Sequence, residues 1–270
     1  MTLRRFSGKK IEPGRTRGLR EDHPALTEAR TIFLKSVTHP LDSPRLLVSG
    51  HNNPKLGNRI LKGPKAGMPL YHLTLEERAT CPKSCHMWAS CYGNAMPYAR
   101  RHDASDILDL AAVLDTELEH LQERFPDGFM VRLHTLGDFP SVEYVNLWRH
   151  FLEEYPALNV FGYTSNWYMA DDETERGIGQ AILTLTNEQW DRFAIRFSTV
   201  ATVPQSAVII EPGDKRPLVL PCPAQSTKTE CCATCGLCWA PEVRGRSIGF
   251  LQHGMKSNTG VRRKVGRHGV

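Results

Sequence analysis

The chain has 270 residues, of which 40% are hydrophobic and 23% charged, and its formal net charge at pH 7 is +5. This composition is typical of a soluble globular protein and excludes a wholly disordered chain. The length suits one large domain with a sizeable buried core better than two independent domains.

Basic residues are concentrated at the two ends of the chain. They are Arg4, Arg5, Lys9, Lys10, Arg15, Arg17 and Arg20 near the start, and Arg262, Arg263, Lys264 and Arg267 near the end. Such ends are either solvated tails or contacts for the phosphates of a nucleic acid. Because no stretch has the apolar run of a signal peptide or a membrane span, we expect a cytoplasmic protein without membrane contact. In that reducing compartment, the eight cysteines indicate metal ligands rather than disulfides.

In chain order, residues 1–30 are predicted to form a basic flexible arm, because they are polar and lack periodicity. An α/β core is predicted to span 31–221, and residues 48–67 within it, rich in Gly, Pro and Asn, are interpreted as loops. Residues 222–253 form a cysteine-rich segment that ends in a predicted strand, and residues 254–270 form a basic tail.

Helices and strands alternate in the predicted core. Apolar residues recur at spacings of three and four over 107–125 and predict an amphipathic helix, and further helices are predicted over 145–155 and 173–187. Strands are predicted at 129–135, 158–164 and 193–199, followed by short β-prone runs at 207–210, 218–220 and 248–252. This alternation predicts a mostly parallel sheet with helices outside it, either open or curled into a partial or full (β/α) barrel.

The predicted strands end in polar residues. Gly137 and Asp138 follow the first strand, Tyr163 and Thr164 close the second, and Ser198 lies at the end of the third. We expect these residues to share one rim, because the chemistry of parallel α/β folds gathers at the carboxyl ends of the strands. Asp138 is the best candidate for ligand binding, since a carboxylate there can hold hydroxyls or an amine. Its alternative role is a cap for the helix that follows.

The strongest motif is a group of cysteines near the C-terminus. Cys232, Cys235 and Cys238 have C-x2-C-x2-C spacing, like the first three ligands of bacterial ferredoxins, and Cys222 or Cys231 can supply a fourth ligand. Zinc is the alternative, since all-cysteine zinc sites also use C-x2-C turns, and free or redox-active thiols are a third interpretation. Cys231 is interpreted as the spare cysteine of the group, which binds no metal. The reason is that Cys232 as the ligand keeps two residues between each of the successive cysteines up to Cys238.

A second group, Cys81, Cys85 and Cys91, precedes the long predicted helix. Three thiolates in one short loop suit a 4Fe-4S cluster whose fourth iron is open to a substrate or cofactor. The alternatives are a structural metal completed by His86, or three unrelated thiols.

At these residues the chain resembles the phage gene product 88 family, which itself resembles radical S-adenosylmethionine (SAM) enzymes. The resemblance covers residues 50–253. The matching features are Asn53-Pro54-Lys55-Leu56-Gly57, Thr80-Cys81-Pro82, Cys91-Tyr92, Gly137-Asp138-Phe139, Tyr163-Thr164 and Cys235-Gly236-Leu237-Cys238-Trp239.

The radical SAM resemblance implies a (β/α) barrel, often partial, and two cluster sites. Cys81, Cys85 and Cys91 would hold a 4Fe-4S cluster whose open iron binds SAM. Their C-x3-C-x5-C spacing departs from the C-x3-C-x2-C that is usual in those enzymes. An auxiliary cluster site is implied near the C-terminus, with the ligands Cys222, Cys232, Cys235 and Cys238.

The same resemblance implies a set of cofactor-binding residues. The Gly137-Asp138 pair would meet the SAM amine, and Ser198 would contact the SAM carboxylate or ribose. The matching residues Tyr92, Tyr163 and Thr164 are placed in the same cofactor site.

The leading hypothesis from the sequence is a radical SAM-like enzyme that cleaves SAM and generates a radical on an unknown substrate. The alternative is a non-enzymatic protein, stabilised by zinc or a cluster, that binds nucleic acid through its basic termini. A third hypothesis combines the two as an enzyme that modifies a nucleic acid or a nucleotide. The sequence indicates neither the substrate nor the oligomeric state.

Overall fold

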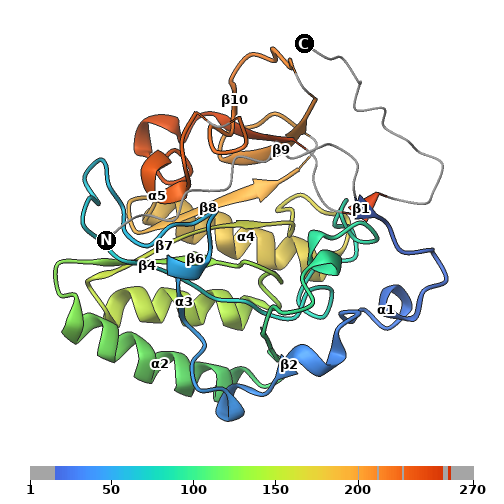
Figure 1. Ribbon diagram of the computed structural model, residues 1–270, viewed down its shortest axis with the longest axis horizontal. Coiled ribbons are helices and arrows are strands. Elements are labelled where there is room, and N and C mark those ends of the chain that lie inside the picture. Colours follow the sequence, from blue (N-terminus) through green and yellow to red (C-terminus); the bar gives the residue numbers. More distant parts are fainter. Residues whose placement is uncertain (1–15, 200, 212, 227, 252–254, 257–270) are drawn as a thin grey trace.

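The computed structural model describes the chain except for residues 1–15, 200, 212, 227, 252–254 and 257–270 (Figure 1). Its centre is an eight-stranded sheet with the order β10-β11-β9-β8-β7-β6-β4-β3. The strands are β3 (Val48–Ser49), β4 (Leu70–His72), β6 (Phe129–Leu133), β7 (Leu158–Thr164), β8 (Phe193–Ser198), β9 (Ser206–Ile210), β10 (Val219–Pro221) and β11 (Ser247–Leu251). Neighbouring strands are parallel except for β3 with β4.

The predicted α/β class with a mostly parallel sheet is confirmed, whereas the predicted closure into a full barrel is not observed. Among the described residues, the edge strands β10 and β3 do not pair with each other, so the sheet is open. In the described chain beyond β8, no long helix continues the outer layer that a closed (β/α) barrel requires. The sequence does not predict β3 and β4, because segments of 2 and 3 residues are too short to show alternation.

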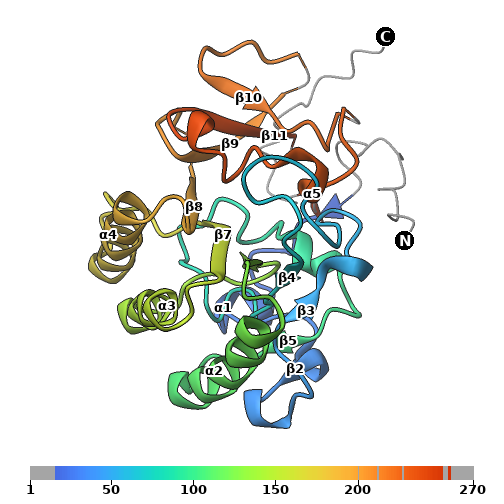
Figure 2. The same ribbon diagram turned by 90° about the vertical axis from the view of Figure 1, so that its left-hand side faces the viewer.

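Three long helices cover one face of the sheet (Figure 2). They are α2 (Ile107–Arg124), α3 (Val142–Glu154) and α4 (Glu173–Glu188), in agreement with the three predicted helices. Each begins after a side chain that accepts hydrogen bonds from backbone N–H groups of the first turn, namely Asp106, Ser141 and Asp172. Because Ser141 caps α3, Asp138 is not the cap of that helix.

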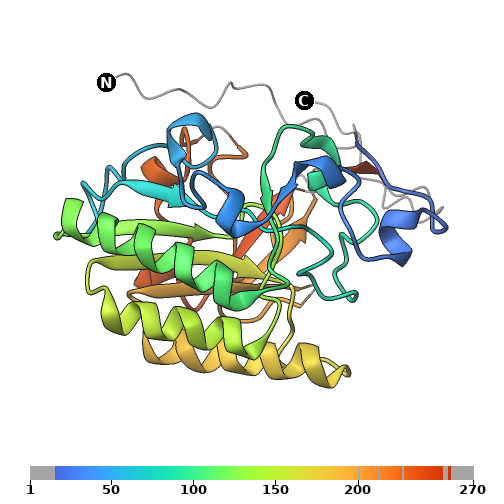
Figure 3. The same ribbon diagram turned by 90° about the horizontal axis from the view of Figure 1, so that it is seen from below.

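The two faces of the sheet contribute to different hydrophobic clusters, because alternate strand residues point in opposite directions. On one face, Val131 and Val160 pack with α2, α3 and α4 in the larger core. On the other face, Met130 and Phe161 cluster with Trp239 of the cysteine-rich segment. The helices therefore lie on one side of the sheet, as Figure 3 shows, and the cysteine-rich segment packs on the other.

Short elements complete the described chain. They are β1 (Thr16–Arg17), β2 (Val37–Thr38), β5 (Arg101–His102), β12 (Met255–Lys256), α1 (Pro24–Thr27), α5 (Cys232–Cys235) and the 3-10 helices Leu34–Ser36, Pro40–Asp42, Gly50–Asn52, Tyr92–Ala95 and Pro241–Val243. Strand β1 pairs with β12, and β2 pairs with β5. Among the described residues, no helix combines the length and apolar character that crossing a bilayer requires.

The predicted basic arm and tail are described only in part. Residues 16–30 contain β1 and α1, and the N–H of the buried Leu19 donates to the Ala89 carbonyl oxygen at 3.0 Å. This part of the predicted arm packs on the loop of the first cysteine group, and the flexibility of the arm stays a prediction. Most of the basic residues predicted to contact phosphates, at positions 4–15 and 262–267, lie outside the described residues.

Candidate functional site

A cavity of about 1210 Å³ lies at the carboxyl ends of the parallel strands. Its wall contains both predicted groups of metal-binding cysteines and all the residues predicted to bind the cofactor. These residues are Cys81, Cys85, Cys91, Cys222, Cys232, Cys235, Cys238, Tyr92, Gly137, Asp138, Tyr163, Thr164 and Ser198. The fold thus brings two cysteine groups that are far apart in the sequence to one cavity, at the rim predicted from the strand ends.

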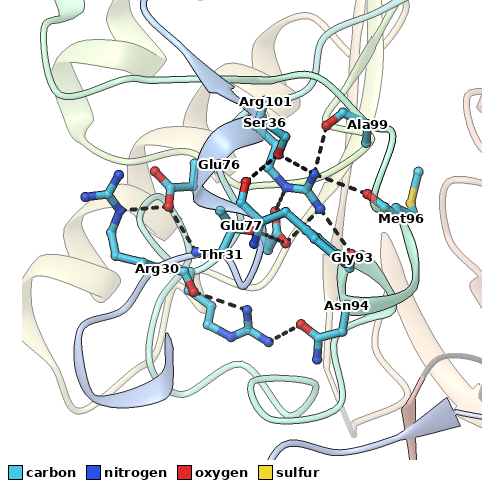
Figure 4. A network of polar contacts seen from close by, with 12 residues as sticks. Arg30, Thr31, Ser36, Glu76, Glu77, Gly93, Asn94, Met96, Ala99 and Arg101 are labelled. Carbon is cyan, nitrogen blue, oxygen red and sulfur yellow. Dashed lines mark hydrogen bonds and ion pairs between the residues drawn. The ribbon is translucent and has the colours of Figure 1, made fainter. Parts of the chain in front are cut away.

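Two buried arginines position the loop of the first cysteine group. Arg101 pairs with the buried Glu77 through two contacts, from Nε to Oε2 at 2.6 Å and from Nη2 to Oε1 at 3.0 Å. Figure 4 shows that the same guanidinium donates to backbone carbonyl oxygens of the chain after the cysteines, including that of Gly93 at 3.1 Å. Arg78 donates from Nε to the Trp88 carbonyl oxygen at 3.1 Å. These contacts hold the loop backbone from inside the protein.

The three thiols of the first group are half-buried in the cavity wall. Burial raises the pKa of Cys81 and Cys85, and it raises the pKa of Cys91 to about 12. The charges of Cys85 and Cys91 also raise the pKa of Cys81, so these thiols interact electrostatically. The Ser165 hydroxyl donates to Cys85 Sγ at 3.4 Å. Without a metal these thiols are protonated at neutral pH, and metal binding must displace their protons.

Asp138 forms a buried junction between the ends of β6 and β7. Its Oδ1 accepts hydrogen bonds from the Thr164 hydroxyl at 2.7 Å and the Phe139 N–H at 2.8 Å. Its Oδ2 accepts the Ser165 N–H at 2.6 Å. Burial raises the pKa of Asp138 to about 6, although these hydrogen bonds act in the opposite direction. Thr164, predicted to bind the cofactor, therefore orients this carboxyl group.

Gly137 packs the end of β6 against the chain that leads into the first cysteine group. Its φ is 81°, in the left-handed region, and an added Cβ would lie 2.7 Å from both Leu75 Cβ and Thr80 Oγ1. Thr80 Oγ1 also accepts the Asp138 N–H at 3.0 Å. Since Thr80 directly precedes Cys81, these contacts bring the Gly137-Asp138 turn next to the cysteine loop.

The C-terminal cysteine group is attached to the loop that contains Lys55. The Cys232 N–H donates to the Lys55 carbonyl oxygen at 2.8 Å, and a second backbone bond of 2.9 Å joins the next residue of each segment. A Cβ added to Gly57 would lie 2.6 Å from Cys231 Sγ, so the two segments are in close contact. Cys231 is 2% exposed and is absent from the cavity wall, and its interpretation as the spare cysteine stays a prediction.

Arg196 of β8 anchors the cysteine-rich segment to the sheet. Its buried guanidinium donates from Nε to the Cys238 carbonyl oxygen at 2.8 Å, from Nη1 to that of Arg246 at 2.8 Å, and from Nη2 to that of Val243 at 3.1 Å. One side chain thus holds three backbone positions of the segment that carries the second cysteine group.

The thiols of the C-terminal group face both a hydroxyl and a cation. The Tyr163 hydroxyl donates to Cys238 Sγ at 2.7 Å. Burial raises the pKa of Cys222 to about 11 and also raises that of Cys232, while the Arg132 guanidinium lowers the pKa of Cys232. Tyr163, predicted to bind the cofactor, is therefore a direct partner of a predicted metal ligand.

The arrangement of the thiols in the structure bears on which kind of metal group they could bind. Among the described residues, no group of three or more His, Cys, Asp or Glu side chains is arranged to hold a metal ion. A single zinc ion bonds its thiolates at about 2.3 Å. A 4Fe-4S cluster attaches each thiolate to a different iron, so its ligands surround a larger body. Two points support the fit of the thiols to an iron-sulfur group. Cysteine thiolates are the usual ligands of such clusters, and the seven thiols line one cavity.

Several charged residues of the site are absent from the sequence prediction. Lys55 belongs to a motif that carried the family resemblance but had no assigned role, and Arg132 lines the cavity beside it. Arg132 and Arg196 each interrupt a run of apolar strand residues. A charged residue inside an otherwise apolar strand is a usable signal, because arginine is almost never fully buried without partners.

The fold and the site define an α/β protein whose open, mostly parallel sheet carries a thiol-lined cavity at the carboxyl ends of its strands. The model of the gene product 88 family matches residues 45–241, and the chain belongs to this family. No curated protein and no solved structure matches the chain. The predicted membership of the gene product 88 family is thereby confirmed, and the resemblance to radical SAM enzymes stays a prediction.

Proposed function

We propose that this protein is an iron-sulfur enzyme of the radical SAM type. The observation that carries the proposal is that seven cysteines from two distant groups line one cavity of about 1210 Å³. The volume is sufficient for a cofactor and a substrate together, since pockets for small ligands usually measure about 300 to 1,000 Å³. The open sheet with its helices on one face is compatible with the partial barrel of such enzymes.

In this proposal the first cysteine group holds a 4Fe-4S cluster through Cys81, Cys85 and Cys91, and the C-terminal group holds an auxiliary cluster. When bound, the first cluster supplies the electron that cleaves the sulfonium bond of SAM. The buried arginines beside the loop fix its backbone, so that the thiols stay oriented toward the cavity. Tyr92, whose hydroxyl donates to the Thr135 carbonyl oxygen, closes the wall next to Cys91.

Asp138 is suited to contact the SAM ammonium in addition to its internal partners. Among the described residues, its Oδ2 accepts one hydrogen bond, from the Ser165 N–H. A carboxylate oxygen can accept two hydrogen bonds, so Oδ2 keeps capacity for a donor from the ligand. The Gly137-Asp138 turn also lies beside the chain that leads into Cys81.

The test is anaerobic purification and reconstitution, followed by analysis of iron, sulfide and zinc and by an assay of 5′-deoxyadenosine from SAM and a reductant. We expect about eight irons per chain for two 4Fe-4S clusters, and formation of 5′-deoxyadenosine. The variant Cys81→Ala should abolish SAM cleavage and retain the C-terminal cluster, whereas Cys231→Ala should change neither.

The possible outcomes separate the two parts of the proposal. Iron and sulfide without 5′-deoxyadenosine would leave an iron-sulfur protein and refute SAM cleavage. Zinc in place of iron and sulfide would refute both parts and favour the metal-stabilised, non-enzymatic alternative.

A further inference from the structure

Arg78 places a buried positive charge behind the loop of the first cysteine group. The residue is 2% exposed and is absent from the cavity wall. Its Nε donates to the carbonyl oxygen of Trp88, which lies between Cys85 and Cys91 in the chain, at 3.1 Å. The Arg78 carbonyl oxygen in turn accepts the Cys81 N–H at 3.3 Å. The arginine is therefore joined to both ends of the cysteine loop from inside the protein.

The groups that accept hydrogen bonds from this guanidinium are uncharged. Besides the Trp88 carbonyl oxygen, they are the Arg30 carbonyl oxygen, 3.3 Å from Nη1, and the Asn94 side-chain oxygen, 2.6 Å from Nη2. In the described part of the chain, Arg78 forms no ion pair with a carboxylate. Its φ of 68° lies in the left-handed region that favours glycine, so the arginine is held here at a conformational cost. A charge that is buried without a counter-charge adds to this cost.

The two carboxylates that directly precede Arg78 in the chain are paired with other arginines. Arg30 Nε lies 2.7 Å from Glu76 Oε1, and Arg101 contacts both carboxylate oxygens of Glu77. The five side chains together carry three positive and two negative charges, and the two ion pairs leave the positive charge of Arg78 without a bonded carboxylate.

The charge of Arg78 acts on the thiols. Burial raises the pKa of Cys85 and Cys91, whereas the Arg78 guanidinium lowers the pKa of both thiols. Asp138 opposes this effect at Cys85, and Glu77 opposes it at Cys91, because each carboxylate raises the pKa of the thiol near it. Metal binding would convert the thiols to thiolates. It would therefore add negative charge next to a cation that already interacts with them.

We propose that Arg78 is the counter-charge of the metal centre held by Cys81, Cys85 and Cys91, and that it raises the reduction potential of a cluster bound there. An iron-sulfur cluster gains one negative charge when it takes up an electron. A nearby cation therefore stabilises the reduced form more than the oxidised form. Arg78 acts through its charge on the thiolates and is not itself a ligand. This role deepens the proposed function and rests on it, because the potential belongs to the iron-sulfur cluster.

The experiment compares Arg78→Gln with Arg78→Lys in the anaerobically reconstituted full-length chain. Both variants lose the planar guanidinium, and only Arg78→Lys keeps the charge. A redox titration followed by electron paramagnetic resonance measures the potential of the first cluster, whose signal is the one that Cys81→Ala removes. We expect a more negative potential, or a loss of iron, in Arg78→Gln. Arg78→Lys should keep the iron content and a potential close to that of the unmodified chain.

The matched control is Arg192→Gln. The Arg192 guanidinium also donates to backbone carbonyl oxygens, those of Leu158 at 3.1 Å and Tyr155 at 2.7 Å, at the amino end of β7 and outside the cavity wall. Its loss should leave the potential of the first cluster unchanged. The same shift in Arg192→Gln as in Arg78→Gln would overturn the proposal. Equal potentials of the two Arg78 variants, or loss of iron from both, would also overturn it, because Arg78 would then only support the loop.

Failure of the proposed function gives different results. A potential that depends on the Arg78 charge in a chain that cleaves no SAM would support the counter-charge and refute SAM cleavage. Zinc in place of iron would refute the iron-sulfur function, and the counter-charge would then be measured by the zinc affinity in competition with a chelator. Weaker zinc binding by Arg78→Gln than by Arg78→Lys would support it, and equal affinities would overturn it.

Discussion

Replacing Glu77 by alanine should strongly destabilise the protein and loosen the loop of the first cysteine group. Glu77 and Arg101 are 1% and 0% exposed, and they are joined by contacts of 2.6 and 3.0 Å. Removal of the carboxylate leaves the guanidinium buried without a counter-charge, which costs about 3 to 5 kcal/mol. This is a large part of a total stability of about 5 to 15 kcal/mol, and it corresponds to a fall in Tm of about 6 to 20 °C.

The assay for Glu77→Ala is urea unfolding under anaerobic, reducing conditions, followed by far-ultraviolet circular dichroism. The matched control is Glu188→Ala, which breaks an ion pair with Arg149 between side chains that are 47% and 33% exposed. Exposed pairs contribute about 0 to 1 kcal/mol, so the control should unfold close to the unmodified chain. If Glu77→Ala loses no more stability than the control, the buried pair does not hold this region and the reasoning is wrong.

Further predictions concern the second cysteine group and the effect of pH. Cys232→Ser should lower the iron content by about half if two clusters are present, while Cys231→Ser should leave it unchanged in the same colorimetric analysis. Tyr163→Phe removes the hydroxyl that donates to Cys238 Sγ. Because hydrogen bonds to the sulfurs raise the reduction potential of a cluster, the potential of the C-terminal cluster should be lower in this variant. A redox titration followed by electron paramagnetic resonance measures it, and an unchanged potential would contradict this prediction. Burial lowers the pKa of His102 from 6.5 to about 4. Between these two pH values, the unfolded chain binds a proton at His102 and the folded chain does not. The contribution of His102 to the free energy of unfolding should therefore fall by about 3 kcal/mol as the pH falls from about 6.5 to about 4. A His102→Gln variant should show a pH profile that is flatter by this amount in urea unfolding at several pH values.

Local patterns in the sequence determined the helices and most strands of the sheet. The leucines of α2 recur at the helical spacing. The segments of β7 and β8 are short apolar runs, and this local pattern favours a buried strand. The cysteine spacings predicted two groups of thiols, and both groups line one cavity. That the thiols of each group bind one metal centre stays a prediction. Membership of the gene product 88 family follows from the same local information.

Tertiary structure alone decided how these parts meet. Nothing in the spacing of Cys81, Cys85 and Cys91 indicates that the C-terminal group lines the same cavity, because that depends on which face of the sheet each segment covers. Likewise Asp138 turned out to join two strand ends, and Ser141 caps the helix for which Asp138 was an alternative cap. Hydrogen bonds of this kind link residues far apart in the chain, so no local pattern encodes them.

The charged residues inside the strands show most clearly what the sequence predicts and what only the tertiary structure decides. The sequence places Arg132 and Arg196 in apolar runs and so marks both as unusual. Only the packed structure separates them: Arg196 donates to three carbonyl oxygens, whereas the buried Nε of Arg132 has no hydrogen-bond partner among the described residues. The physical reason is that burial creates the need for a hydrogen-bond partner, and the arrangement of distant segments decides whether the protein supplies one.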